Sequence, residues 1–141
     1  MNAPQASGPL LLCLDLEAGS EALARAANAH ARACGQAIAI IHLLPPHGPE
    51  KEREHARLRL ERLVRETLSG IRLLGIEIRR GVPEEDLTAY ARERGAGVLV
   101  LGRRKRPEVE RIYVGSTTGA VLSLATCPVL VVPLPPPYSD G

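Results

Sequence analysis

The residues best suited to chemistry lie where a buried apolar run gives way to a polar loop. Residues 98–101 are apolar, Gly102 follows them, and after a basic loop the sequence Gly115-Ser116-Thr117-Thr118 opens a helical pattern. Free backbone N–H groups, small hydroxyl side chains and the positive end of a helix would converge there. Such a combination favours an anion, most often a phosphate group. The same residues are also typical of an ordinary Ser/Thr helix cap, and the loop alone leaves both interpretations open.

A second polar position, Asp15, follows the first apolar run, residues 10–14. In open parallel sheets, ligands bind beyond the carboxyl ends of strands where the strand order reverses. Asp15 could therefore contact a ligand, or it could be a simple turn or helix-capping acid. The sequence contains no G-x-x-x-x-G-K-[ST] and no G-x-G-x-x-G after the first apolar run. This argues against a P-loop NTPase and a dinucleotide-binding Rossmann enzyme.

Histidines and cysteines give no sign of a metal site or a nucleophile. The spacing of His42, His47 and His55 fits no usual zinc pattern, and we expect His42 to be a positioned structural histidine. The three cysteines, at positions 13, 34 and 127, form an odd number and include no C-x-x-C pair. We expect them to be small buried hydrophobic residues in a reducing compartment.

The elements that would position these residues alternate regularly. Five short apolar runs are expected as strands and four helical patterns separate them. The expected strands are residues 10–14, 37–44, 76–80, 98–101 and 128–132, and the expected helices are residues 17–33, 51–68, 83–94 and 115–125. This order predicts an α/β fold, a doubly wound parallel sheet with helices on both faces. The third run alternates apolar and basic residues, which indicates an edge strand. We expect residues 102–114 to be an irregular basic loop.

Length and composition bound the protein class. The chain has 141 residues, a net charge of +2 and 2% aromatic residues. One domain fits this length, here residues 9–133, between a flexible start, residues 1–8, and a Pro-rich flexible tail, residues 134–141. The mild charge gives no case for a nucleic-acid or membrane-surface partner, and the few aromatic residues argue against a single-strand binder. With no signal peptide and no apolar run near 20 residues, we expect a soluble cytoplasmic protein.

In the second loop, two residues separate Gly102 from Lys105, and nine residues separate Lys105 from Gly115-Ser116. This spacing resembles the motif G-x2-G-x9-G-[ST] that ATP-binding members of the universal stress protein family carry. Further matches are Leu12-Cys13-Leu14-Asp15, Ile41-His42-Leu43, Gly81-Val82-Pro83 and the strand Cys127 to Val132. The resemblance spans roughly residues 10–133, almost the whole chain.

The resemblance implies a five-stranded sheet of order 3-2-1-4-5, of the adenine nucleotide alpha hydrolase-like type, that binds ATP or another adenine nucleotide, with or without Mg²⁺. It also implies a homodimer formed through strand 128–132 and a regulatory role in stress response. Carried over by position, Asp15 would approach the adenosine and Leu43 would line the adenine pocket. The nucleotide-binding residues implied are Cys13, Asp15, Leu43, Leu101, Gly102, Arg104, Lys105, Gly115, Ser116 and Thr117.

One departure from the family pattern opens an alternative. Lys105 stands where the motif has its second glycine, and if that position needs a positive φ, lysine costs about 1–2 kcal/mol. The four cations of residues 103–106 could hold phosphate by side chain instead, or they could form a solvated basic loop with no ligand. The alternatives to a nucleotide-binding regulator are thus an interaction module that has lost the nucleotide and a slow ATPase. An ATPase is the weakest of these, because no carboxylate pair for Mg²⁺ is evident and Asp15 is the sole general-base candidate near the loop.

Overall fold

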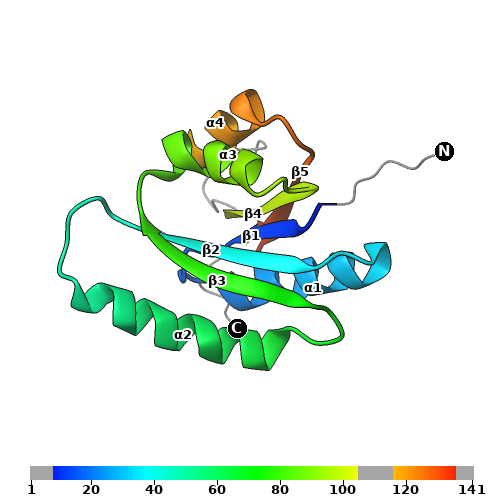
Figure 1. Cartoon of the computed structure of the whole chain (residues 1–141), viewed down its shortest axis with the longest axis horizontal. Coiled ribbons are helices and arrows are strands. Elements are labelled where there is room, and N and C mark those ends of the chain that lie inside the picture. The colour runs from blue at the N-terminus through cyan, green and yellow to red at the C-terminus, as the bar shows by residue number, and fades with distance from the viewer. Residues whose placement is uncertain (1–7, 105–115, 136–141) are drawn as a thin grey trace.

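The computed structural model describes residues 8–104 and 116–135 (Figure 1). Strands and helices alternate along the chain as predicted. Their bounds are β1 Leu10–Cys13, α1 Ser20–Cys34, β2 Ile38–Leu44, α2 Lys51–Thr67, β3 Leu73–Arg80, α3 Pro83–Glu93, β4 Val98–Arg104, α4 Ser116–Leu124 and β5 Val129–Leu134.

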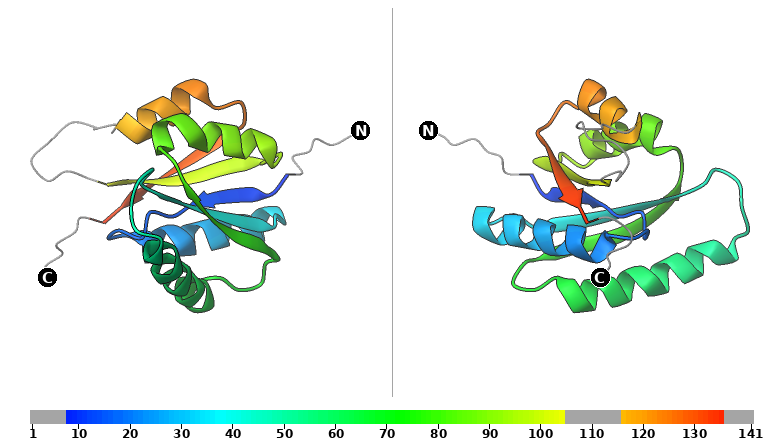
Figure 2. Two further views of the ribbon diagram at one scale, coloured as in Figure 1. Left: turned by 60° about the vertical axis from the view of Figure 1, so that its left-hand side comes forward. Right: turned by 180° about the vertical axis from the view of Figure 1, so that it is seen from behind.

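The five strands form one parallel sheet in the order β3-β2-β1-β4-β5, which confirms the predicted topology. Helices α1 and α2 cover one face, and α3 and α4 cover the other (Figures 1 and 2). The sheet therefore has an apolar core on each side. One core packs Ala27 of α1 and Leu60 of α2 against the strands, and the other packs Leu87 of α3 and Val121 of α4.

The alanine-rich sequence of α1 explains how that helix covers the centre of the sheet. Ala24, Ala27 and Ala31 recur at intervals of three and four and are buried. Small side chains at these positions bring the helix axis close to the strands. The same intervals recur in α2, where Ala56 and Leu60 are buried and Leu63 and Val64 pack against the same core.

The first loop is longer than the sequence predicts. Helix α1 begins at Ser20 rather than Glu17, since the chain turns through two left-handed residues, Leu16 at φ 62° and Gly19 at φ 97°. Gly19 tolerates this conformation without strain, whereas the Cβ of Leu16 makes the same conformation strained. The strain at Leu16 is compensated in part by packing of its side chain against the core.

Strands β4 and β5 are longer than predicted. Strand β4 continues through Gly102 to Arg104, where the sequence indicates a loop, and β5 continues to Leu134. The cause is the β4–β5 ladder, in which Arg103 pairs with Pro133 and Arg104 pairs with Leu134. Proline is tolerated there because β5 lies at the edge of the sheet, where one side of the strand needs no donor.

No helix within residues 8–104 and 116–135 is both long and apolar enough to cross a membrane. The expectations for residues 1–7 and 136–141 concern segments outside the described residues.

Candidate functional site

The candidate site lies at the carboxyl ends of β1 and β4, the neighbouring strands between which the order of the sheet reverses. Two cavities open there. The smaller has a volume of about 160 Å³ and lies among the ends of these strands and the first turns of α1, α3 and α4. The larger, about 420 Å³, lies beside the end of β2 and α2. Asp15 lines both cavities and so marks where they adjoin.

Most of the residues predicted for the site meet at these cavities. Those that line the smaller cavity are Cys13, Asp15, Leu101, Gly102, Arg104 and Thr117. Leu43 lines the larger cavity. Lys105 and Gly115 lie outside the described residues, and of Ser116 the structure describes only the backbone, as the first residue of α4.

Asp15 organises the loop that follows β1. The backbone N–H of Glu17 donates to Asp15 Oδ1 at 2.9 Å, which is an Asx turn. Asp15 does not cap α1, because Gly19 holds the cap position and no side chain accepts there. The alternative of a turn acid is therefore confirmed as one role of Asp15.

Arg104 joins the end of β4 to this same loop. Its Nη2 lies 3.1 Å from the carboxylate of Asp15, and its Nε donates to the carbonyl of Ala18 at 3.0 Å. Both side chains are partly exposed, so the pair contributes about 1 kcal/mol or less to folding. Its significance is positional, since it holds a guanidinium group at the wall of the smaller cavity.

Several lining residues of the smaller cavity were missed by the sequence analysis. They are Ser20, Leu23, Pro83, Leu87 and Leu134. Leu134 matters most, because the sequence analysis assigns it to the tail, yet it is buried and packs against Gly19 and Gly102. The sequence did contain a signal, because Leu134 is an apolar residue that follows the predicted strand after a single proline.

Hydroxyl groups in the smaller cavity already have protein partners. Ser20 Oγ donates to the carbonyl of Glu17 at 2.9 Å, and Thr117 Oγ1 donates to Glu84 Oε2 at 3.2 Å. The contact of Thr117 links the start of α4 to the start of α3. A ligand that uses these hydroxyls would have to exchange or share those hydrogen bonds.

The thiol of Cys13 is chemically quiet. Burial, and secondarily the negative charge of Asp15, raises the pKa of Cys13 to about 12. The thiol is thus protonated near neutral pH and is a wall of the cavity rather than a nucleophile. Cys13 and Cys127 are partly buried, but Cys34 is exposed on α1, so the expectation that all three are buried is wrong for Cys34.

The larger cavity is shaped around His42. The ring is buried, and its Nδ1 lies 2.7 Å from the carbonyl of Leu14. Because a carbonyl can only accept, Nδ1 carries the proton, which confirms His42 as a positioned structural histidine. Within the described ranges, no group of three or more His, Cys, Asp or Glu side chains is arranged to hold a metal ion.

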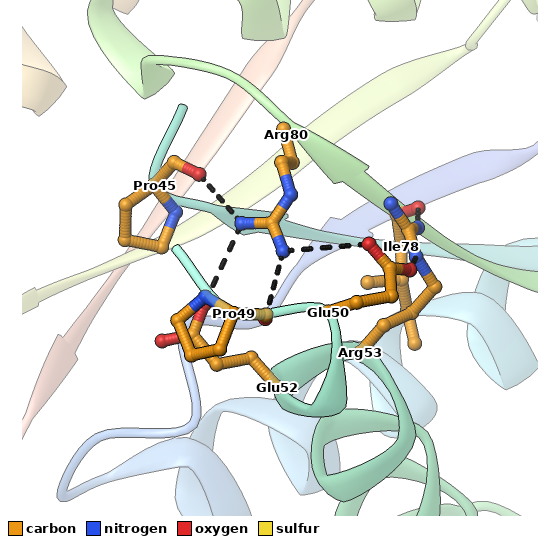
Figure 3. A network of polar contacts seen from close by, with 7 residues as sticks. All are labelled: Pro45, Pro49, Glu50, Glu52, Arg53, Ile78 and Arg80. Atoms are coloured by element: carbon orange, nitrogen blue, oxygen red, sulfur yellow. Dashed lines mark hydrogen bonds and ion pairs between the residues drawn. The ribbon is translucent and has the colours of Figure 1, made fainter. Parts of the chain in front are cut away.

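A polar network fixes the loop between β2 and α2 beside the larger cavity (Figure 3). The guanidinium of Arg80, at the end of β3, donates to the carbonyls of Pro45 at 2.9 Å and Pro49 at 3.0 Å. It also lies 3.5 Å from a carboxylate oxygen of Glu52. Pro45 and Glu52 both line the larger cavity, so this network holds one of its walls in place.

Comparison with known proteins gives one consistent family. The family model described as Universal stress protein family matches residues 8–133. A universal stress protein of Methanocaldococcus jannaschii is 37% identical over 59 residues, which is 42% of this chain and only 35% of that relative's length. A universal stress protein of Thermus aquaticus is 28% identical over 132 residues, covering 87% of this chain and 96% of the relative.

Solved structures share the fold. A universal stress protein from Archaeoglobus fulgidus in complex with dAMP aligns with a TM-score of 0.67 at 22% identity, over 90% of this chain and 98% of that one. A universal stress protein in complex with cAMP aligns with a TM-score of 0.64 at 20% identity, over 89% of this chain and 97% of that one.

Proposed function

Because this chain belongs to the universal stress protein family, whose model matches residues 8–133, we propose that it binds an adenine nucleotide at the carboxyl ends of β1 and β4. The observation that carries the proposal is the pair of cavities that adjoin at Asp15. The complexes of related folds with dAMP and cAMP support adenine as the base. Bound nucleotide would then change the conformation or partner binding of a stress-response regulator.

The two cavities differ in the chemistry that they offer. The larger one has apolar walls at Leu43 and Leu44 and the buried ring of His42, which suit a purine and its ribose. The smaller one offers the Arg104 guanidinium and the backbone of Gly102, which suit a phosphate group. We therefore assign the nucleoside to the larger cavity and the phosphate end to the smaller.

Mg²⁺ would depend mainly on the nucleotide for its ligands. Asp15 is the one carboxylate among the described residues that line the smaller cavity. Mg²⁺ commonly keeps several waters and binds through substrate phosphates together with one or two carboxylates. A metal accompanying ATP would thus be held by phosphate oxygens and, at most, by Asp15.

Calorimetric titration with AMP and with MgATP tests the proposal, using wild type, Arg104→Gln and Arg103→Gln. Arg103 is the matched control, because it neighbours Arg104 on β4 but lines neither cavity. We expect saturable binding in the wild type that Arg104→Gln weakens about tenfold, the worth of one hydrogen bond to a charged group. We expect Arg103→Gln to bind as the wild type does.

Absence of saturation with both nucleotides up to millimolar concentration would contradict the proposal. The result would favour the alternative, an interaction module that has lost nucleotide binding. Two observations agree with that alternative: lysine stands at position 105 in place of the motif's glycine, and Leu134 is buried against Gly102. Equal weakening by both arginine variants would instead indicate a diffuse charge effect and place the phosphate elsewhere.

A further inference from the structure

The end of β5 contributes a side chain to the smaller cavity. Leu134 is the last residue of that strand, pairs across the sheet with Arg104 and is 5% exposed. It lies between two glycines on different elements, Gly19 before α1 and Gly102 in β4. A Cβ at position 102 would lie 2.6 Å from Leu134 Cδ1, and a Cβ at position 19 would lie 3.0 Å from the same atom. Leu134 thus occupies the space that both glycines leave free.

This placement changes what Gly102 can do. A glycine beside a cavity allows a ligand to approach the backbone closely. Here the isobutyl group of Leu134 lies against Gly102, so it fills part of the space through which a ligand could approach that backbone. The remaining volume of the smaller cavity, about 160 Å³, is less than half of the roughly 420 Å³ of the adjoining cavity, to which we assign the nucleoside.

The chemistry of the wall reinforces the limit on volume. Arg104 is the one cation among the described residues that line the smaller cavity, and it can satisfy one phosphate group. Leu134 offers no hydrogen bond, and burying further phosphate charge against an apolar group is costly. Leu134 forms one wall of the smaller cavity, so a longer phosphate chain held there would have to share the cavity with this side chain.

We propose that Leu134 is a specificity-determining residue that limits the site to nucleotides with a single phosphate, such as a nucleoside monophosphate, and disfavours triphosphates. The inference rests on the proposed adenine-nucleotide function. It concerns the length of the phosphate chain, which the family assignment leaves open.

The test is the ratio of the dissociation constants of MgATP and AMP, measured by calorimetry on wild type, Leu134→Ala and Leu130→Ala. Leu130 is the matched control, because it lies on β5 and packs against the same core but lines neither cavity. We expect ATP to bind more weakly than AMP in the wild type. Leu134→Ala should lower the ratio by about tenfold or more, the discrimination usual for small changes in apolar pocket volume. Leu130→Ala should leave it unchanged.

Each outcome bears on one of the two proposals. If both nucleotides bind and the ratio is the same in wild type and Leu134→Ala, the inference about Leu134 is overturned and the nucleotide function stands. If neither nucleotide binds any variant, the proposed function fails and the inference fails with it. If nucleotide binds only after Leu134→Ala, Leu134 closes the site to every nucleotide, which overturns the inference that this residue selects for a single phosphate.

A second variant separates the effect on the cavity from an effect on folding. Leu134→Val keeps an apolar residue in the core and removes one methylene group, so it should lower the ratio by less than Leu134→Ala does. Leu134→Met conserves the volume and should leave the ratio near that of the wild type. A ratio that follows the melting temperature of the variants instead of side-chain volume would overturn the inference.

Discussion

At the residue scale, the ion pair between Arg104 and Asp15, 3.1 Å long, joins the end of β4 to the loop that follows β1. Asp15 and Gly102 were predicted because they follow apolar runs, and residues at the ends of neighbouring parallel strands meet in space. The ion pair of Asp15 with Arg104 was not predicted, because its partners are 89 positions apart and nothing in the local sequence joins them. That contact depends on β4 running three residues beyond the predicted strand.

The pKa of Cys13 gives a prediction about stability at alkaline pH. The pKa rises from an ordinary value of 9.0 to about 12 through burial and, secondarily, the charge of Asp15. The folded chain therefore holds this proton more tightly than the unfolded chain. The resulting stabilisation is complete below pH 9 and is lost as the pH rises toward 12, by about 1.4 kcal/mol per pH unit.

Replacement of the thiol should remove this part of the pH dependence. We expect the free energy of unfolding of Cys13→Ala, measured in urea from neutral pH to about pH 10.5, to fall less steeply above pH 9 than that of the wild type. Cys34→Ala is the control, because that thiol is exposed on α1, and its curve should follow the wild type. Parallel curves for all three proteins would show that the Cys13 thiol ionises normally.

At the element scale, the strands of the site were predicted in kind but not in length. Gly102 and Pro133 are typical of loops, so both strands were predicted to end before them. The structure keeps them in strands because each backbone finds a partner across the β4–β5 ladder. Strand formation depends on such neighbours more than on intrinsic preference, so strand ends are difficult to predict from one sequence.

The close contact between β4 and the end of β5 can be tested without any ligand. A methyl group at position 102 would meet Leu134, so Gly102→Ala should destabilise the protein by about 1–3 kcal/mol through overpacking. Leu134→Ala alone should cost about 2–5 kcal/mol, because it removes a buried side chain. In the double variant the new methyl group has space. The double variant should therefore lose less stability than the sum of the losses of the two single variants, and the difference should be about 1 kcal/mol or more.

Gly35→Ala provides the matched control for this cycle. Gly35 ends α1 at φ 68° with no atom near its Cβ position, so alanine there costs about 1 kcal/mol through backbone strain alone. Urea unfolding should give additive effects for Gly35→Ala and Leu134→Ala. Additive effects for Gly102→Ala and Leu134→Ala as well would mean that Leu134 does not lie against Gly102.

At the scale of the whole molecule, the alternation of strands and helices was enough to predict the layers. The buried strands have continuous apolar sequences. In β3, apolar and charged residues alternate, which correctly predicted that this strand lies at an edge of the sheet. The strand order followed from the family resemblance rather than from the residues alone. The fold places the ends of β1 and β4 together, and it leaves β3 and β5 as the two edges of the sheet.

The two edges of the sheet make the homodimer that the family resemblance implies testable. Strand β5 is apolar from Val129 to Val132, and the nearby helix α4 has two leucines, Leu122 and Leu124, that are 51% and 54% exposed. An apolar edge strand is a surface that pairs with another chain unless it is covered, and a second copy of this chain would cover it. We therefore expect the protein to form a dimer through β5, burying roughly 1,200–2,000 Å² in total.

Sedimentation equilibrium of wild type, Val131→Glu and Leu74→Glu identifies the edge that is used. A charge at Val131 on β5 should shift the mass from dimer to monomer, since a carboxylate buried at an apolar interface has no partner. Leu74, 46% exposed on the opposite edge strand β3, is the matched control, and its variant should remain dimeric. Dissociation by Leu74→Glu alone would assign the interface to β3, and a monomeric wild type would show that each copy keeps its β5 edge unpaired.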